Sequence, residues 1–343
     1  MNKIRDLTIV SLSSGILGED FVRHELEIGL RRLREMGLRV RFSAHCLRGI
    51  AYLKAHPEAR AQDLLDAFRS DTDMILCAIG GDDTYRLLPY LFDHDELRDA
   101  LRDKVFLGFS DSTVNHLMLH KLGLNSFYGQ AFLPDVCELA PDMLPYTRAY
   151  FEELIATGTV RRIRPSAVWY ESRQDFGPEA VGSALRAHEN PGFELLQGGA
   201  RFGGPILGGC IDTLFDLFDA GRYADSPALC ARYDLFPPLS DWAGKLLLLE
   251  TSEEQPEPEC FRRMLRALKS TGIFEVIGGV LFGKPADEKY SDAYKRLLVE
   301  EIARPELPIV ANLSVGHALP RCIVPFGVPA IVDADRQEIV FAT

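Results

Sequence analysis

The sequence predicts a two-domain α/β protein, with an N-terminal Rossmann-like parallel sheet flanked by helices and a smaller, β-rich α/β second domain. Three observations predict this fold class: continuous apolar segments alternate with helix-like segments in the first half, the chain has 343 residues, and Gly and Pro become frequent near its middle. Continuous apolar strands that alternate with helices indicate a parallel sheet covered on both faces. A chain of this length fits two domains of ordinary size, which we expect to span residues 1–165 and 166–343.

The first half contains four apolar segments that predict strands, at 4–11, 38–42, 73–79 and 105–109. Helical spacing of apolar residues predicts helices at 19–36 and 60–69, a further helix that begins at 87, and another that ends at 122. In the second half we expect strands at 245–250, 276–282 and 330–332, and helices at 212–220 and 258–270. Gly and Pro interrupt residues 161–209, so no long element is expected there.

Composition and charge narrow the classes of partner. The net charge of −12 argues against a nucleic-acid polymer, because proteins that bind one normally present a basic face. No segment approaches the ~18 continuous apolar residues of a membrane span, and the first apolar segment is too short and interrupted for a signal peptide. The seven cysteines are scattered and form no CxxC pair, which predicts free thiols in a reducing compartment. We therefore expect a cytoplasmic protein without a membrane partner, and nothing in the sequence indicates a cofactor.

Gly80 and Gly81 form a turn where a predicted strand runs into a helix. Two glycines allow a sharp turn with exposed N–H groups, which suits an oxyanion or a phosphate. A double glycine after a strand is common, so this turn alone favours a plain strand-to-helix connection.

Ser110 stands at the carboxyl end of the fourth predicted strand and at the mouth of a helix. This position lifts a hydroxyl out of the sheet in the manner of a nucleophile elbow, although the sequence is not GxSxG. The residues alone leave open that Ser110 or Asp111 merely caps the helix. Both this turn and the Gly80–Gly81 turn, however, follow strands of a doubly wound sheet, at the edge where ligands bind.

His317 lies in a Gly- and Pro-bounded loop and is the best candidate for a general base among the eight histidines. His116 and His120 have the spacing of paired zinc ligands, but the segment HLMLH lacks the glutamate of that motif and no third ligand is nearby. His94 lies in an acidic run typical of a solvated turn. We therefore predict no metal site.

A serine–histidine pair needs a third group that orients the imidazole. Glu250 ends the apolar segment KLLLLE, which is an unusual place for a carboxylate unless it points into a site. The residues alone leave Glu253 and Glu254 as alternatives.

Taken together, these segments resemble the LD-carboxypeptidase family of serine peptidases, and within it the branch of the microcin C self-immunity peptidase. The resemblance covers nearly the whole chain, in order: SLSSG, IGGDDTYRLLPYLFD, VFLGFSDST, YGQAFLPD, GPILGGCIDTLFDLFDAGRYAD, GKLLLLETSEE, GVLFGKP and VGHALPRCIVPFG. Ordered matches of this density are far more specific than any single motif.

The resemblance implies a catalytic triad of Ser110, Glu250 and His317, with Glu250 and His317 supplied by the second domain. It also implies an oxyanion hole of backbone amides, at Gly81 or Asp82 and at Asp111, and a homodimer. The first turn, SLSSG, lacks a proline often found in the family, and GGDD carries two acids where relatives vary.

The resemblance further implies a small peptide or peptidyl-nucleotide substrate, and two substrates compete. One is a peptidyl or aminoacyl nucleotide, as in the immunity branch, and the other is a murein tetrapeptide. The branch stacks an aromatic side chain on a nucleobase, for which Trp169 and Phe193 are candidates. A terminal carboxylate needs a cation, for which Arg86, Arg201 and Arg321 are candidates. A catalytically silent binding protein and a metal hydrolase are the alternatives from other classes, and the glycine-rich segment 171–204 is a candidate lid.

Overall fold

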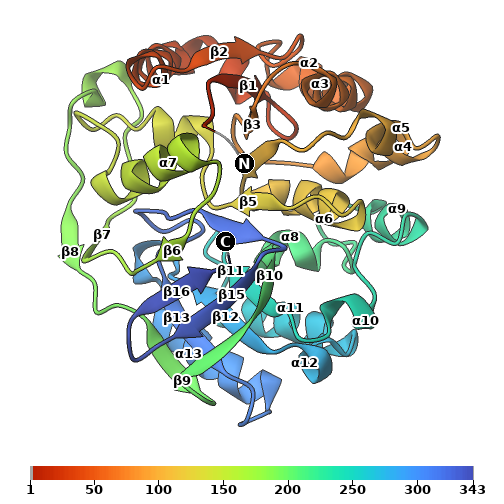
Figure 1. The fold of residues 1–343 in the computed structure, drawn as a ribbon, viewed down its shortest axis with the longest axis vertical. Helices are drawn as coiled ribbons and strands as arrows, with labels where there is room; N and C mark the ends of the chain where they lie inside the picture. The colour runs from red at the N-terminus through yellow and green to blue at the C-terminus, as the bar shows by residue number, and fades with distance from the viewer. Residues whose placement is uncertain (1–2, 343) are drawn as a thin grey trace.

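The computed structural model describes residues 3–342 and contains two large sheets (Figure 1). The first sheet has the order β14-β5-β4-β3-β1-β2. Its strands β1 to β5 are mutually parallel, and β14 pairs antiparallel with β5. The strands are β1 (Asp6–Val10), β2 (Arg39–Phe42), β3 (Met74–Cys77), β4 (Val105–Gly108), β5 (Ser126–Tyr128) and β14 (Val324–Phe326).

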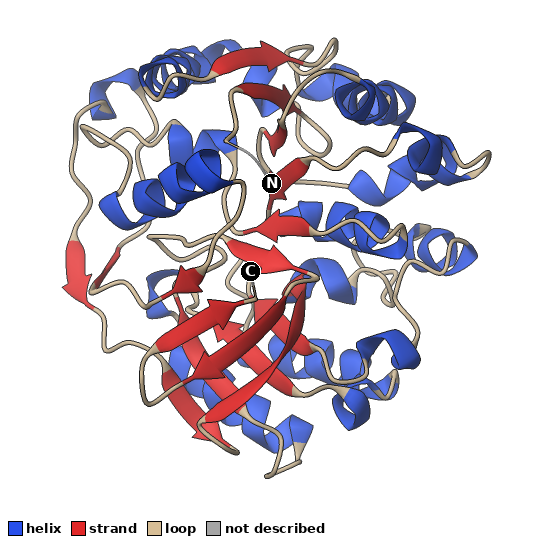
Figure 2. Cartoon of the chain, in the orientation of Figure 1, coloured by secondary structure: helices blue, strands red, loops and turns tan. Residues whose placement is uncertain are grey.

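The central strands of this sheet are buried on both faces because helices cover it (Figure 2). The helices are α1 (Arg23–Glu35), α2 (Ile50–Ala55), α3 (Pro57–Arg69), α4 (Leu88–Phe92), α5 (Glu96–Ala100), α6 (Thr113–Lys121) and α7 (Pro145–Thr157).

The second sheet has eight strands in the order β6-β16-β15-β10-β11-β12-β13-β9, and a separate hairpin is formed by β7 and β8. Strands β10 to β13 run parallel, whereas β9, β15, β16 and β6 complete the sheet through antiparallel pairs. The strands are β6 (Arg162–Ile163), β7 (Val168–Tyr170), β8 (Ala187–Glu189), β9 (Glu194–Gln197), β10 (Arg201–Cys210), β11 (Leu246–Glu250), β12 (Gly279–Gly283), β13 (Ile309–Leu313), β15 (Pro329–Asp333) and β16 (Glu338–Phe341). The helices of this half are α8 (Ile211–Phe215), α9 (Ser226–Arg232), α10 (Leu239–Trp242), α11 (Pro258–Ser270), α12 (Ile273–Val276) and α13 (Ser291–Ile302).

This architecture confirms the predicted fold class, with three local corrections. Strand β10 runs for ten residues, Arg201–Cys210, through a segment in which Gly and Pro predicted no long element. Glycine serves close strand packing there, since a Cβ at Gly208 would meet the carbonyl oxygen of Leu248 at 2.0 Å. The strand predicted at 276–282 begins only at Gly279, because Ile273–Val276 forms the short helix α12. The helix predicted at 212–220 ends at Phe215. Strand β6 already pairs with β16 of the second sheet, and β14 returns to the first, so the chain passes between the sheets more than once. The boundary at residue 165 stays a prediction.

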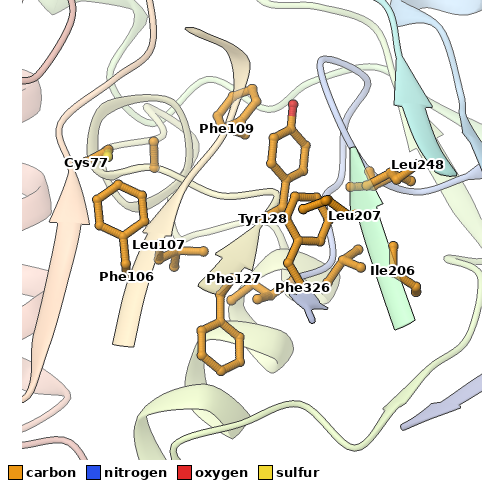
Figure 3. Close-up of a cluster of buried hydrophobic side chains, with 14 of the residues drawn as sticks. Cys77, Phe106, Leu107, Phe109, Phe127, Tyr128, Ile206, Leu207, Leu248 and Phe326 are labelled. Atoms are coloured by element: carbon orange, nitrogen blue, oxygen red, sulfur yellow. The ribbon is translucent and has the colours of Figure 1, made fainter. Parts of the chain in front are cut away.

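The return of β14 joins the two halves through a shared apolar core. Val324 and Phe326 are Cα partners of Tyr128 and Ser126 on β5. The ring of Tyr128 stacks on Phe326 at a centroid distance of 5.2 Å, and Ile206, Leu207 and Leu248 of the second sheet complete the cluster (Figure 3). The rigid packing fixes the carboxyl ends of β4, β5 and β11 relative to one another.

Candidate active site

Ser110 occupies a strained turn directly after β4. It starts a single 3-10 turn, Ser110–Ser112, and its φ of +65° is a left-handed conformation that is uncommon for a residue with a side chain. Its backbone N–H donates a hydrogen bond of 3.1 Å to the hydroxyl of Tyr128, which helps to hold this conformation. A side chain at Gly80 would lie 2.6 Å from Cβ of Ser110, so only glycine allows this close approach.

His317 and Glu250 complete a hydrogen-bonded chain to Ser110. Nε2 of His317 lies 3.1 Å from Oγ of Ser110, and Nδ1 lies 2.7 Å from Oε2 of Glu250. The backbone N–H of His317 donates to the same oxygen at 3.2 Å. The approach requires Gly316, whose φ is +92° and where a Cβ would meet Oε2 of Glu250 at 2.4 Å. The structure thus brings together three side chains that the sequence separates by up to 207 positions.

Tyr128 is a residue of this network that the sequence did not single out. Its hydroxyl donates to Oε1 of Glu250 at 2.6 Å and accepts from the N–H of Ser110. Glu250 is completely buried, and both of its oxygens therefore accept hydrogen bonds. A tyrosine at the end of a strand beside β4 was the available signal, but nothing in the sequence places it against Glu250.

Two turns meet at the Ser110 hydroxyl, the turn with Gly80 and Gly81 and the turn with Asp111. Gly80 and Gly81 line the same cavity as Ser110, and Gly81 has a φ of +119°. The carboxylate of Asp111 ties them together, since it accepts from Ser13 Oγ at 2.6 Å and from the N–H of Thr84 at 2.9 Å. Burial raises the pKa of Asp111 to about 6, while these two hydrogen bonds oppose the increase. Asp82 does not line the cavity, and its side chain bonds to Arg222 and Tyr223.

Glu253, one of the two acids that the residue pattern left as alternatives to Glu250, also contacts His317. Its Oε2 lies 2.9 Å from Nε2 of His317, the same nitrogen that faces Ser110. The side chain of Glu253 is 68% exposed, so it is free to leave this position. Burial by itself lowers the pKa of His317, but Glu250 and Glu253 outweigh it and raise this pKa to about 10. The hydrogen bond from His317 lowers the pKa of Glu253 to about 2.

A cavity of about 610 Å³ opens above these residues. Ser110, His317 and Glu253 lie on its wall. The rest of the lining includes the apolar side chains of Phe21, Phe109, Leu133, Leu139 and Phe176 and the charged side chains of Glu25, Glu138, Arg173 and Arg321. Phe21 and Phe176 are both more than half exposed, so the cavity wall carries two largely exposed aromatic rings.

The structure places the two aromatic candidates, Trp169 and Phe193, outside this cavity lining. Trp169 lies on the β7–β8 hairpin at the left edge of Figure 1, and its ring stacks on His188 at 4.3 Å. Phe193 is 6% exposed and packs in the core. Phe176, like Phe193, lies in the segment 171–204 that the sequence offers as a candidate lid, and it lines the cavity.

Of the three arginine candidates, only Arg321 lines the cavity. Its guanidinium is held by Asp135 at 2.9 Å and lies over the ring of Phe109, so it fastens the His317 loop to the first half of the chain. Arg86 is paired with Asp83 and Asp225. Arg201 is exposed at the start of β10, opposite Asp333.

The histidines with metal-ligand spacing turn to separate partners. His116 contacts Ser126 Oγ and the carbonyl of Gly108, and burial lowers its pKa to about 4. His120 contacts Asp241. His94 lies beside Asp93 and Glu96 in a shallow surface hollow. Within residues 3–342, the one grouping of three metal-capable side chains is Cys210, Glu250 and His317, and it coincides with the hydrogen-bonded chain described above.

The fold and the hydrogen-bonded chain from hydroxyl to carboxylate are those of an α/β serine hydrolase. The protein belongs to the LD-carboxypeptidase family of serine peptidases. Models of the family's N-terminal and C-terminal domains match residues 7–129 and 203–332. A putative carboxypeptidase of Streptomyces coelicolor is 32% identical over 84% of this chain and 78% of its own length.

The chain is also similar to a solved MccF-like protein from Streptococcus pneumoniae in complex with AMP, with 60% identity, a TM-score of 0.98 and 99% of each chain covered. The microcin C7 self-immunity protein MccF of Escherichia coli is 23% identical over 82% of this chain and 77% of its own length. A murein tetrapeptide carboxypeptidase of Pseudomonas aeruginosa is 25% identical over 91% and 89%. The relatives thus include a microcin C7 self-immunity protein and a murein tetrapeptide carboxypeptidase.

Proposed function

We propose that this serine peptidase hydrolyses peptidyl- or aminoacyl-nucleotide amides, with Ser110 as nucleophile, His317 as base and Glu250 as the acid that orients His317. The observation that carries the catalytic part is the continuous chain of contacts, 3.1 Å and 2.7 Å long, at the wall of one cavity. Nucleophile, base and orienting acid within hydrogen-bond reach are the requirements for acyl transfer.

In this reaction His317 Nε2 removes the proton of Ser110 as Oγ attacks the amide carbonyl. Backbone amides at Gly81 and Asp111 stabilise the oxyanion, which lowers the barrier by about 3 kcal/mol per donor. The C–N bond then breaks, and His317 gives its proton to the leaving nitrogen. Water, deprotonated by His317, hydrolyses the acyl-enzyme and restores Ser110.

The contact between Glu253 and His317 defines a resting state that must change during turnover. A carboxylate bound to Nε2 requires a proton on that nitrogen, whereas a base must present a lone pair to Ser110. Substrate binding therefore has to displace Glu253, and its exposed side chain allows this. The geometry supports a catalytic cycle in which His317 becomes a base only after this displacement.

Replacing Glu253 with glutamine is expected to move the rising limb of the kcat/KM–pH profile to lower pH by about one unit. The carboxylate of Glu253 stabilises the imidazolium, so its removal lowers the pKa of His317 and yields the neutral base at lower pH. The matched control is Glu254→Gln, which alters the adjacent acid of the same loop. An unshifted or upward-shifted limb in the Glu253 variant would contradict the proposed resting state.

The two exposed rings in the cavity support the nucleotide substrate. Phe21 and Phe176 offer flat apolar faces to a base, and the similar MccF-like protein was solved with AMP. His24 Nε2 lies 3.0 Å from the carbonyl of Phe176, which holds this segment against α1. We propose that Phe176 takes the stacking role for which the sequence suggested Trp169 or Phe193.

Phe176→Ala is expected to weaken binding of a nucleotide substrate by about 5- to 150-fold, the usual cost of losing one base–aromatic stack. Hydrolysis of a murein tetrapeptide, which has no base, should be unchanged if that peptide is turned over at all. Steady-state kinetics on both substrates in parallel measure the two effects. Faster hydrolysis of the tetrapeptide than of the nucleotide amide by the unmodified protein would replace the proposal with the murein alternative.

We also propose a cytoplasmic homodimer, as the resemblance and the free thiols indicate. All seven cysteines are free, and six of them are buried, which suits a reducing compartment. Across residues 3–342, no helix is both long and apolar enough to traverse a bilayer.

A further inference from the structure

Glu25 is a buried carboxylate on the cavity wall that the catalytic steps do not use. The residue is 6% exposed and lines the same cavity as Ser110 and His317. Within the described residues 3–342, its carboxylate has neither a hydrogen-bond donor nor a cation within ion-pair distance. Its oxygens are not among the completely buried side-chain atoms that lack a partner, so they reach the cavity, where a bound group can pair with them.

Helix α1 holds Glu25 at this position. Glu25, Gly29 and Arg32 share one helix face, and Arg32 donates to the carbonyls of Val136, Glu138 and Ala140. A Cβ at Gly29 would meet Cys137 Sγ at 2.3 Å, so glycine permits this close packing. Glu25 does not serve as a helix cap, because the N-cap position is Val22 and makes no side-chain hydrogen bond.

The charges around Glu25 do not balance. Arg173 is the nearby cation, and its guanidinium is committed to Glu138, with Nε 3.0 Å from Oε1. The side chains of Arg173 and Glu138 are each 7% exposed, and their charges neutralise one another. Glu25 is left as an additional carboxylate, and burial, followed by the charge of Glu138, raises its pKa to about 7. Such an unpaired group costs stability, and proteins retain this cost mainly at functional sites.

We propose that Glu25 is a specificity-determining residue that accepts a hydrogen bond from an amino group of the substrate, an inference that rests on the proposed nucleotide-amide hydrolase function. An N–H donor satisfies the carboxylate, and the rings of Phe21 and Phe176 on the same cavity wall suit a flat or cationic neighbour. Two parts of the substrate carry such a group: the exocyclic amine of the base and the ammonium of the aminoacyl part.

The test measures binding without turnover, by calorimetry on the Ser110→Ala protein. The probes are an aminoacyl sulfamoyl adenosine, its purine-riboside analogue without the exocyclic amine, and its N-acetylated analogue without the ammonium. Adding Glu25→Leu should weaken binding of the first probe about tenfold or more, the cost of a hydrogen bond to a charged group. The same substitution should leave the affinity for one of the two analogues unchanged. The amine that this analogue lacks is the one that Glu25 binds.

Two further measurements separate recognition from structure. Glu27→Leu, on the exposed side of the same helix, should leave all three affinities unchanged. Thermal unfolding of Glu25→Gln, which keeps the size of the side chain, should give an equal or higher Tm because an unpaired buried charge is removed. Equal weakening of all three probes, no weakening of any, or a lower Tm for Glu25→Gln would overturn the proposal. If the first probe binds and only the Glu25 effect is missing, the proposed function stands. If the first probe fails to bind, both proposals fall.

Discussion

Replacing Ser110 with alanine is expected to reduce kcat by about 10⁴-fold or more while leaving substrate affinity within a few-fold. The change removes the Oγ atom that lies 3.1 Å from His317 Nε2, and no other hydroxyl is part of that contact. The cavity wall keeps its shape, because Gly80 already packs against Cβ of Ser110, which alanine retains. Kinetics with an aminoacyl-nucleotide amide and calorimetry with a stable analogue measure the two quantities separately.

The control is Ser112→Ala, two residues further along the same turn, where a buried hydroxyl without a hydrogen-bond partner is removed. This variant should keep its rate. Labelling with a serine-directed phosphonate should modify Ser110 in the unaltered protein. The Ser110→Ala protein should remain unlabelled at that position. Normal turnover by the Ser110 variant would rule out its role as nucleophile, and an unlabelled, inactive natural protein would favour the binding-protein alternative.

The parts of the fold that follow local patterns could be predicted from the sequence. The segments VFLGF and KLLLLE are continuously apolar because β4 and β11 are buried along their whole length, so their ends, and with them Ser110 and Glu250, could be located. The choice of Glu250 over Glu253 came from the family resemblance. In the structure both acids contact the imidazole of His317, Glu250 at Nδ1 and Glu253 at Nε2. The residue pattern alone could therefore not decide which of them orients the ring.

Contacts that depend on three-dimensional packing could not be predicted. Tyr128 and Glu250 are 122 positions apart and end strands of different sheets, β5 and β11, so no local pattern reveals their contact. Phe176 and Phe193 lie in one segment of the sequence, but the ring of Phe176 is exposed and the ring of Phe193 is buried. The backbone of Phe176 is held against α1 by His24, a contact that no local pattern reveals. Glu25 reads as an ordinary first-turn acid of an amphipathic helix, and only its burial sets it apart.

The two acids of the GGDD turn illustrate the same point. The sequence assigns no role to the side chains of Asp82 and Asp83. In the structure, Asp82 accepts hydrogen bonds from Arg222 and Tyr223 of the second half of the chain. Asp83 binds Arg60 and Arg86, and Arg86 continues to Asp225. These contacts fasten the double-glycine turn between the two halves. Both acids therefore hold this turn in place through ion pairs with arginines.

Glu250→Gln is expected to lower kcat by about 10³- to 10⁴-fold, because glutamine has the shape of glutamate but cannot accept hydrogen bonds at both ends. Oε1 accepts from Tyr128, and Oε2 accepts from Nδ1 and the backbone N–H of His317. Whichever end of the amide becomes NH₂, one donor faces another donor, so either Tyr128 loses its partner or His317 loses the bond that fixes its tautomer.

The pH profile of the same variant provides an independent readout. Burial lowers the pKa of His317 and Glu250 is the largest opposing influence, so removing its charge lowers this pKa. The rising limb of kcat/KM should therefore shift to lower pH even as the plateau falls. Loss of folding alone would reduce the plateau without shifting the limb, and Glu254→Gln should change neither. A Glu250→Gln protein with a near-normal plateau, or with an unshifted limb, would show that His317 is oriented by another group, for which Glu253 is the nearest carboxylate.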